Sequence, residues 1–180
     1  MMSASSNVLL ITGIPGIGKT TVAKKVVTSL ADHNIGGFYT EEIRVNNVRQ
    51  GFELITIQGE RFVMAHVDSD SAYRVGKYGV DVEIIDTAIA MTLSEDPDTE
   101  VFIIDEIGKM ECFSKKFRAA MRGLLDSGRP LVATVALRGG GFIAEVKGRP
   151  DVEIWEVTKA NRNEMPAQIL RWLERRYNEP

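Results

Sequence analysis

Eight residues near the start of the chain have the types and the spacing of a phosphate-binding loop. Gly13-Ile14-Pro15-Gly16-Ile17-Gly18-Lys19-Thr20 fits the pattern G-x-x-x-x-G-K-[ST] in full. The glycines let the backbone wrap around a phosphate chain, so that its N–H groups point at the phosphate oxygens. In this pattern the lysine reaches the β- and γ-phosphates and the threonine hydroxyl binds Mg²⁺. We therefore expect a nucleotide site in which Lys19 is a catalytic cation and Thr20 is a metal ligand.

Two adjacent acids follow a buried apolar run in the second half of the chain. Residues 101–104 predict a central strand, and Asp105 and Glu106 stand at its carboxyl end. Open α/β sheets bind ligands at this edge, so we expect the acids to lie beside the phosphate loop. Asp105 would hold Mg²⁺ through its water shell, and Glu106 would orient and deprotonate an attacking water. The alternative is an acidic strand end that faces solvent.

The elements that must position these residues alternate along the chain. Short apolar runs predict buried strands, and apolar residues three and four apart predict helices. The expected strands cover 8–11, 38–43, 101–104, 131–135 and 152–157, and the expected helices cover 22–30, 81–93, 113–125, 142–146 and the segment from Met165 onward. Such alternation predicts an α/β fold of three layers, with a mainly parallel central sheet covered on both faces.

Residues 43–80 do not follow this alternation of strands and helices. Asn46-Asn47 is a plausible tight turn, and residues 51–57 and 62–67 resemble strands that a Gln-Gly-Glu turn separates. We predict an antiparallel β insert over about 43–67, followed by a loop at 75–80. The whole chain, residues 1–180, is expected to be one domain.

Composition excludes several other classes of protein. The chain has 180 residues, 44% apolar and 26% charged, which argues against disorder and coiled coil. Its net charge of −3 argues against non-specific nucleic-acid binding. No apolar stretch approaches the roughly 20 residues of a membrane span, and Cys112 is the single cysteine, which indicates a reducing, cytoplasmic setting. His33, His66 and Cys112 lack the spacing of a zinc site. We expect a monomer.

Several motifs stand in an order that is typical of one family. After the phosphate loop come Gly37-Phe38-Tyr39-Thr40-Glu41-Glu42, residues 75–81, the string Asp-Glu-Ile-Gly-Lys-Met-Glu at 105–111, and Asn161-Arg162. Over nearly its whole length the chain resembles the small nucleoside-triphosphatase family known from thermophiles and as the human cancer-related NTPase. The resemblance implies a P-loop NTPase fold of the RecA- and AAA-like branch. It also implies slow, Mg²⁺-dependent hydrolysis of ATP, GTP and other NTPs to NDP and phosphate, with little base preference.

The resemblance also assigns nucleotide binding to two segments. In this chain they consist of Gly13, Ile14, Pro15, Gly16, Ile17, Gly18, Lys19, Thr20 and Thr21, and of Val101, Phe102, Ile103, Ile104, Asp105, Glu106, Ile107 and Gly108. One departure is visible at residues 139–141, where three glycines follow Arg138 and many members have basic or polar residues. What this loop contributes to the site is left open.

Phosphoryl transfer favours a further cation at the γ-phosphate. Lys109 and Arg162 follow strand ends at the ligand-binding edge and are the candidate catalytic cations, with Arg138 a weaker one; the alternative is a solvated surface cation. Glu41, Glu42 and Arg44 could act near the water or simply decorate the insert. Tyr39 and Tyr78 could stack on a base or pack inside. The arginines of 171–176 are expected on a helix face in water.

The hydrolase competes with two other functions on the same fold. A nucleotide or nucleoside kinase would transfer the phosphoryl group to an acceptor hydroxyl. A nucleotide-gated binding module, acting for example on RNA, would turn over slowly until its partner is added. Glu106 beside Asp105 favours the hydrolase, because a hydrolase needs a positioned water.

Overall fold

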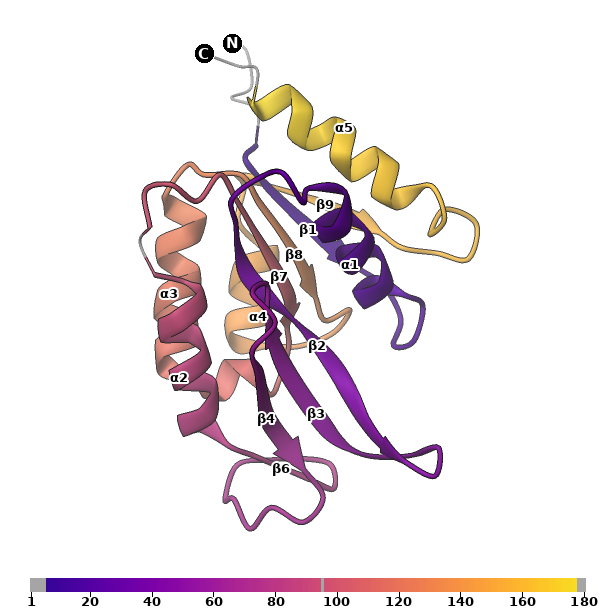
Figure 1. Ribbon diagram of the computed structural model, residues 1–180, viewed down its shortest axis with the longest axis vertical. Helices are drawn as coiled ribbons and strands as arrows, with labels where there is room; N and C mark the ends of the chain where they lie inside the picture. Colours follow the sequence, from indigo (N-terminus) through magenta and orange to yellow (C-terminus); the bar gives the residue numbers. More distant parts are fainter. Residues whose placement is uncertain (1–5, 95, 178–180) are drawn as a thin grey trace.

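The computed structural model describes residues 6–94 and 96–177, and its middle layer is a sheet (Figure 1). In this described part the sheet has nine strands in the order β5-β6-β4-β3-β2-β7-β8-β1-β9. The strands are β1 (Val8–Thr12), β2 (Ile35–Val45), β3 (Val48–Thr56), β4 (Arg61–His66), β5 (Arg74–Val75), β6 (Tyr78–Val80), β7 (Val101–Ile107), β8 (Leu131–Val135) and β9 (Val152–Glu156).

Half of the sheet is parallel, and this half carries the predicted strand ends. Strand β7 pairs in parallel with β2 and β8, and β1 pairs in parallel with β8 and β9. All residues of β1 and β8 are buried. Strands buried on both faces need continuous apolar runs rather than alternation, which is what the sequence has at these positions. The predicted α/β sheet is confirmed.

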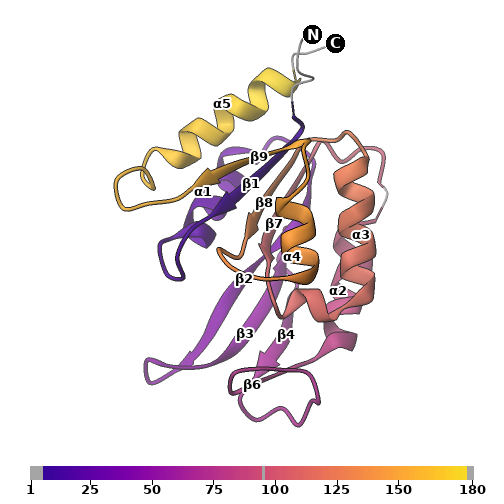
Figure 2. The same cartoon turned by 180° about the vertical axis from the view of Figure 1, so that it is seen from behind.

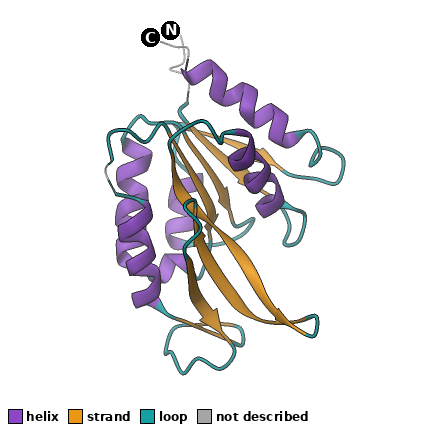
Figure 3. Cartoon of the chain, in the orientation of Figure 1, coloured by secondary structure: helices purple, strands orange, loops and turns teal. Residues whose placement is uncertain are grey.

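Helices cover both faces of the sheet (Figures 2 and 3). Their bounds are α1 (Lys19–Ser29), α2 (Val82–Thr92), α3 (Lys115–Asp126), α4 (Gly141–Lys147) and α5 (Met165–Tyr177), with a short 3₁₀ turn at Glu111–Phe113. Alternate residues of β1 point to opposite faces: Leu10 belongs to the core that includes residues of α2, α3 and α4, whereas Leu9 belongs to the core that includes residues of α1 and α5. The molecule therefore has two apolar cores separated by the sheet.

The antiparallel half begins inside β2, which is one strand of 11 residues. Its first residues pair with β7, and from Phe38 onward it also pairs antiparallel with β3. The ladder continues through β4 to Val80, so antiparallel pairing extends beyond the predicted 43–67 on both sides. Asn46 and Asn47, with φ of 49° and 63°, form the two-residue hairpin turn. Asparagine tolerates this left-handed conformation, and the predicted turn is confirmed.

The predicted loop at 75–80 is wrong. Residues 74–75 and 78–80 form the strands β5 and β6, and Ala65 of β4 pairs with Val80. Strands of two and three residues leave no periodic pattern in the sequence. They form here because β4 offers them an edge to pair with, which is a non-local cause.

Two helix starts follow from side-chain caps. Ser114 accepts a hydrogen bond from the Phe117 N–H at 2.9 Å, and Asp81 accepts one from the Ile84 N–H at 3.0 Å. Each cap satisfies a backbone donor that the first turn of a helix leaves without a partner. The predicted cap at Ser114 is confirmed.

The C-terminal helix differs from expectation at Arg176. This side chain is only 6% exposed. Its guanidinium lies 3.5 Å from the centre of the Trp172 ring and donates to Glu153 at 2.9 Å and to the Ser6 carbonyl at 2.6 Å. The expectation of a solvated arginine is therefore wrong at this position. A buried cation needs partners; Trp172 lies one helical turn away, whereas Glu153 and Ser6 come from segments more than 20 residues away.

Candidate functional site

The phosphate loop joins β1 to α1 and depends on its glycines. Gly16 and Gly18 have φ of 77° and 113°, a backbone conformation that side chains with a Cβ rarely adopt. Lys19 is the first residue of α1, and its ammonium folds back to donate to the Gly13 carbonyl at 3.1 Å. The lysine is 9% exposed. The charge therefore lies inside the loop, where a bound phosphate would reach it.

Asp105 meets the loop from β7. Its carboxylate is fully buried and accepts hydrogen bonds from the hydroxyl groups of Thr20 at 2.8 Å and Thr134 at 2.5 Å. The Thr40 N–H adds a longer contact of 3.4 Å. Three segments that are far apart in the sequence thus converge on the Asp105 carboxylate, and the phosphate loop meets the end of β7 as expected.

A bulge in β7 separates the roles of the two acids. The pairing with β8 runs from Ile104 opposite Ala133 to Ile107 opposite Val135, so β7 holds one extra residue. Bulges redirect side chains near the ends of strands. Asp105 turns into the sheet, whereas the Glu106 side chain remains 30% exposed.

Glu106 pairs with the loop lysine. Its Oε2 lies 3.5 Å from the Lys19 Nζ. Burial raises the pKa of Glu106 above its ordinary value; the charge of Lys19 opposes this rise and the charge of Asp105 adds to it. A carboxylate in these surroundings is a stronger base than one in water, which suits a group that takes a proton from water.

The oxygen donors around Asp105 fit a magnesium ion. The carboxylate of Asp105 and the hydroxyl of Thr20 lie next to each other, and Mg²⁺ prefers one or two carboxylates completed by water and phosphate oxygens. Among residues 6–94 and 96–177, no three His, Cys, Asp or Glu side chains gather as a metal cage. A site for Mg²⁺ that binds together with nucleotide needs no such cage.

Glu111, the last residue of the string at 105–111, is a second buried acid to which the sequence analysis assigned no role. It is 5% exposed, and a Cβ added at Gly108 would lie 2.8 Å from its Oε2 and 3.1 Å from the Oε1 of Glu106. The two carboxyl groups therefore face each other across Gly108. Burial, together with the charge of Glu106, raises the pKa of Glu111 to about 8, so Glu111 carries a proton at neutral pH.

This proton predicts a pH dependence of stability. The folded pKa is about 8 and the ordinary value is 4.5, so between these limits the unfolded chain loses a proton that the folded chain keeps. The free energy of unfolding then falls as pH rises through this window. The free energy of unfolding is measured with urea at pH 5.5 and at pH 8. Between these two pH values it should fall by about 1–3 kcal/mol less in Glu111→Gln than in the parent protein. Equal losses in both proteins would contradict a protonated Glu111.

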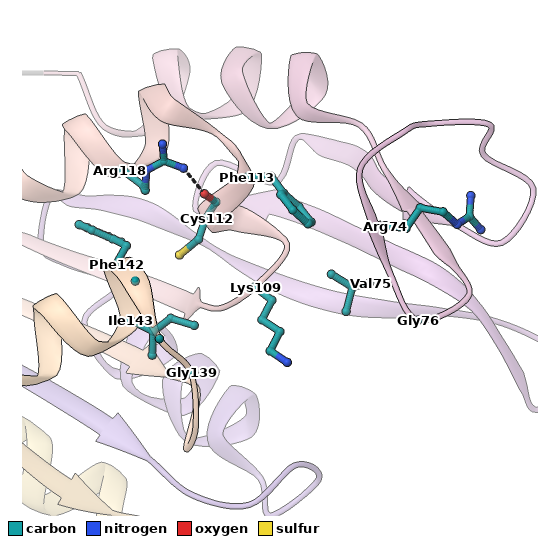
Figure 4. A pocket seen from close by; sticks show the side chains of 12 residues that line it. Arg74, Val75, Gly76, Lys109, Cys112, Phe113, Arg118, Gly139, Phe142 and Ile143 are labelled. Atoms are coloured by element: carbon teal, nitrogen blue, oxygen red, sulfur yellow. Dashed lines mark hydrogen bonds between the residues drawn. The ribbon is translucent and has the colours of Figure 1, made fainter.

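The predicted cations lie at different places. Arg162 reaches the phosphate loop, because its Nη1 donates to the Ile17 carbonyl at 3.5 Å. Lys109 is exposed and lines a separate cavity next to the site (Figure 4). Arg138 is exposed at the end of β8. Of the three, Arg162 alone contacts the loop.

The apolar part of β7 supports the site from beneath. Val101, Phe102, Ile103 and Ile104 are 0–1% exposed and pack into the two cores. These four side chains, which the resemblance places in a nucleotide-binding segment, are covered by helices. Their contribution is therefore to position Asp105 and Glu106.

The acids of β2 pair with cations of the neighbouring helix and strands. Glu41 contacts Lys24 and Arg61, and Glu42 contacts Arg44 and Arg49. Hydrogen bonds and charges from these cations lower the pKa of both acids below the ordinary value, against the opposing effect of burial. Both acids are occupied by cations of α1 and the antiparallel ladder, as the simpler of the two interpretations expected.

The two tyrosines pack against protein groups. Tyr78 is 7% exposed and lies edge-on to Phe52 at 5.1 Å, so its ring is not free to stack on a base. Tyr39 is half-buried, with the Lys24 ammonium 4.7 Å from the centre of its ring.

The sequence motifs of this site match a known family. A sequence model described as NTPase matches residues 8–170. The chain belongs to this family. The nucleoside-triphosphatase THEP1 of Thermotoga sp. (strain RQ2) is 43% identical to it over 163 residues, which cover 90% of this chain and 92% of the relative. The resemblance drawn from the motifs is confirmed.

Two solved structures of NTPase relatives are similar in fold. THEP1 from the hyperthermophile Aquifex aeolicus has a TM-score of 0.84 at 38% identity, covering 92% of this chain and 98% of that one. A human cancer-related nucleoside triphosphatase has a TM-score of 0.77 at 35% identity, covering 91% and 95%. This chain therefore shares its fold with both relatives.

Thr40, Thr134 and Glu111 are the site residues that sequence reasoning missed. Thr134 is the one polar residue of β8, near its carboxyl end. A hydroxyl in an otherwise apolar buried strand at the ligand-binding edge is a signal that could have been used. The other two lie in the segments 37–42 and 105–111 that carry the family resemblance, and the sequence analysis assigned them no role there.

Proposed function

We propose that this NTPase-family chain hydrolyses nucleoside triphosphates to diphosphates and phosphate with Mg²⁺. The observation that carries the proposal is the meeting of two distant segments: Thr20 bonds to Asp105 at 2.8 Å, and Lys19 lies 3.5 Å from Glu106. One edge of the sheet then carries a phosphate-binding loop, a possible site for a divalent cation and a general base for water. These are the parts that phosphoryl transfer to water requires.

The chain's own residues divide the work. The loop amides and Lys19 hold the β- and γ-phosphates. Glu106 takes a proton from a water whose oxygen forms a bond to the γ-phosphorus, while the bond from that phosphorus to the β,γ-bridging oxygen breaks. Thr20 and Asp105 would hold Mg²⁺, which neutralises phosphate charge when bound. Arg162, beside the loop, is the candidate for the charge that develops on the transferred group.

Phosphate binding also prepares the base. Lys19 now shares its charge between the Gly13 carbonyl and Glu106. When a phosphate takes the ammonium, Glu106 loses its stabilising partner while it stays half-buried. Since the charge of Lys19 is what restrains the raised pKa of Glu106, the pKa should rise further as substrate binds. The carboxylate then becomes a better proton acceptor when it is needed.

Broad base preference follows from which part of the nucleotide is held. Every contact proposed above is to phosphate or metal, and all triphosphates share those groups. Tyr78 is packed inside, so it cannot select a base by stacking.

The cytoplasmic location and the monomeric state stay predictions. No helix among residues 6–94 and 96–177 has the length and apolar character for crossing a bilayer.

Release of phosphate without an acceptor tests the proposal. The protein is mixed with Mg²⁺ and ATP, GTP, CTP or UTP in turn, and free phosphate and the nucleoside diphosphate are both measured. We expect equal amounts of both products, rates for the four bases within about tenfold, and no release with EDTA. A protein that gives no phosphate until a nucleoside or nucleotide is added would instead be a kinase, and hydrolysis would be the wrong function.

A further inference from the structure

A cavity of about 640 Å³ lies beside the proposed phosphate site, and none of the proposed catalytic groups except Lys109 lines it. The loop after β7 forms one wall, with Lys109, Cys112 and Phe113 (Figure 4). The loop after β8 and the start of α4 form another, and the turn between β5 and β6 closes the far side. Its volume is typical of a site for a small molecule.

The cavity is positive. Three cations line it, namely Arg74, Lys109 and Arg118, and no acidic side chain does. Within residues 6–94 and 96–177, no carboxylate oxygen comes within 4.0 Å of any of these three cations, whereas six of the thirteen arginines have such a partner. A bound anion would be attracted to these charges.

The three cations are not equally free. Arg74 donates to the carbonyls of Ser69 and Lys77 at 3.0 and 2.7 Å, so it holds its own loop. Arg118 donates one N–H to the Cys112 carbonyl, which leaves four of the five donors of its guanidinium. Lys109 has no hydrogen bond or ion pair with any described residue, and its chain extends freely in Figure 4. Lys109 is therefore the lining cation that is most available to an anion (Figure 4).

The rest of the lining is apolar and partly aromatic. The rings of Phe113 and Phe142 face it, together with Ile143 and Val75. Burial raises the pKa of the Cys112 thiol to about 12, so this side chain is neutral and adds to the apolar wall. Such a lining favours a ligand with a flat hydrophobic body, because aromatic faces and edges pack well against a ring.

The cavity borders the reacting centre through a short piece of chain. Lys109 follows Glu106 by three residues, which can span at most about 11 Å. On the other side, the loop with Gly139–Gly141 follows β8, whose Thr134 holds Asp105 at 2.5 Å. Both walls therefore begin at the residues that carry the proposed chemistry.

From this charge, lining and position we infer that the cavity is a second ligand site, which binds a flat aromatic molecule carrying a phosphate or carboxylate group next to the bound triphosphate. The anion would bind the Lys109 ammonium, and the ring would lie against the half-buried side chains of Phe113 and Val75 (Figure 4). This assigns Lys109 to the second ligand rather than to the γ-phosphate.

Calorimetric titration with AMP as the probe tests the inference. The protein is first saturated with Mg²⁺ and a non-hydrolysable ATP analogue, so that AMP cannot occupy the phosphate loop. We expect one equivalent of AMP to bind. Adenosine and inorganic phosphate should each bind at least tenfold more weakly, because adenosine lacks the anion and phosphate lacks the ring. The titration is repeated on Lys19→Ala without triphosphate. AMP binding to this variant would support the second site even if the proposed hydrolysis is wrong.

Two variants and a matched control locate the site. Lys109→Ala removes the free cation, and Gly140→Leu adds bulk at the cavity where a new Cβ meets nothing within 4 Å; each should weaken AMP at least tenfold. Arg138→Ala removes an exposed cation that does not line the cavity and should change AMP affinity less than twofold. The inference is overturned if AMP does not bind, or if it binds Lys109→Ala and Gly140→Leu as tightly as the parent protein.

Discussion

Glu106→Gln is expected to lower kcat for triphosphate hydrolysis by about 10²–10⁴-fold, the usual contribution of a positioned general base. Affinity for Mg²⁺-nucleotide should be kept or increase. The carboxylate now holds Lys19 at 3.5 Å and would repel the γ-phosphate, and glutamine removes both effects. Single-turnover phosphate release gives the rate, and calorimetry with a non-hydrolysable analogue gives the affinity.

The matched control is Glu111→Gln. This acid faces Glu106 across Gly108 but already carries a proton at neutral pH because its pKa is raised to about 8. Glutamine copies that neutral state, so kcat should change less than about threefold. If Glu111→Gln stops turnover while Glu106→Gln keeps it, the base has been assigned to the wrong carboxylate.

Gly37→Ala is expected to destabilise the fold by about 3–5 kcal/mol, near the upper end for one substitution. Gly37 pairs with Ile103 in the strand that carries Asp105 and Glu106. Its φ is +112°, and a Cβ there would lie 2.0 Å from the Ile103 carbonyl oxygen. A backbone atom cannot move aside as the end of a flexible side chain can, so β2 would have to separate from β7.

Gly123→Ala is the control for this change. Gly123 lies inside α3, and an added Cβ meets nothing within 4 Å. Alanine in a helix interior should stabilise the protein by about 0.4–1 kcal/mol. Thermal unfolding separates the two, since 1 kcal/mol corresponds to about 2–4 °C at this chain length. Similar melting temperatures for the two variants would refute the close contact between β2 and β7.

The parts of the site that the sequence predicted are the local ones. The phosphate loop is fixed by eight consecutive residues, and the strand before it and the helix after it follow from apolar patterning. Asp105 and Glu106 stand out because they end a buried strand. General knowledge of where α/β sheets bind ligands was enough to expect Lys19, Thr20 and these two acids together.

The parts that sequence reasoning missed depend on which strands become neighbours. Thr40 and Thr134 reach Asp105 across 65 and 29 residues, and nothing in their own segments states that β2 and β8 flank β7. Glu111 is buried by packing that forms only in the folded chain. Arg176 was expected in water because it is charged. In the fold it packs on Trp172 and donates to Glu153, and its side chain has low exposure.

The most direct test of one site built from two segments is a crystal structure of Glu106→Gln with Mg²⁺ and ATP. We expect the terminal phosphate at the Lys19 ammonium, the metal between Thr20 and Asp105, and the residue 106 side chain facing the γ-phosphorus across a water. A triphosphate bound away from residues 13–20, or a residue 106 side chain turned away from the terminal phosphate, would contradict the account.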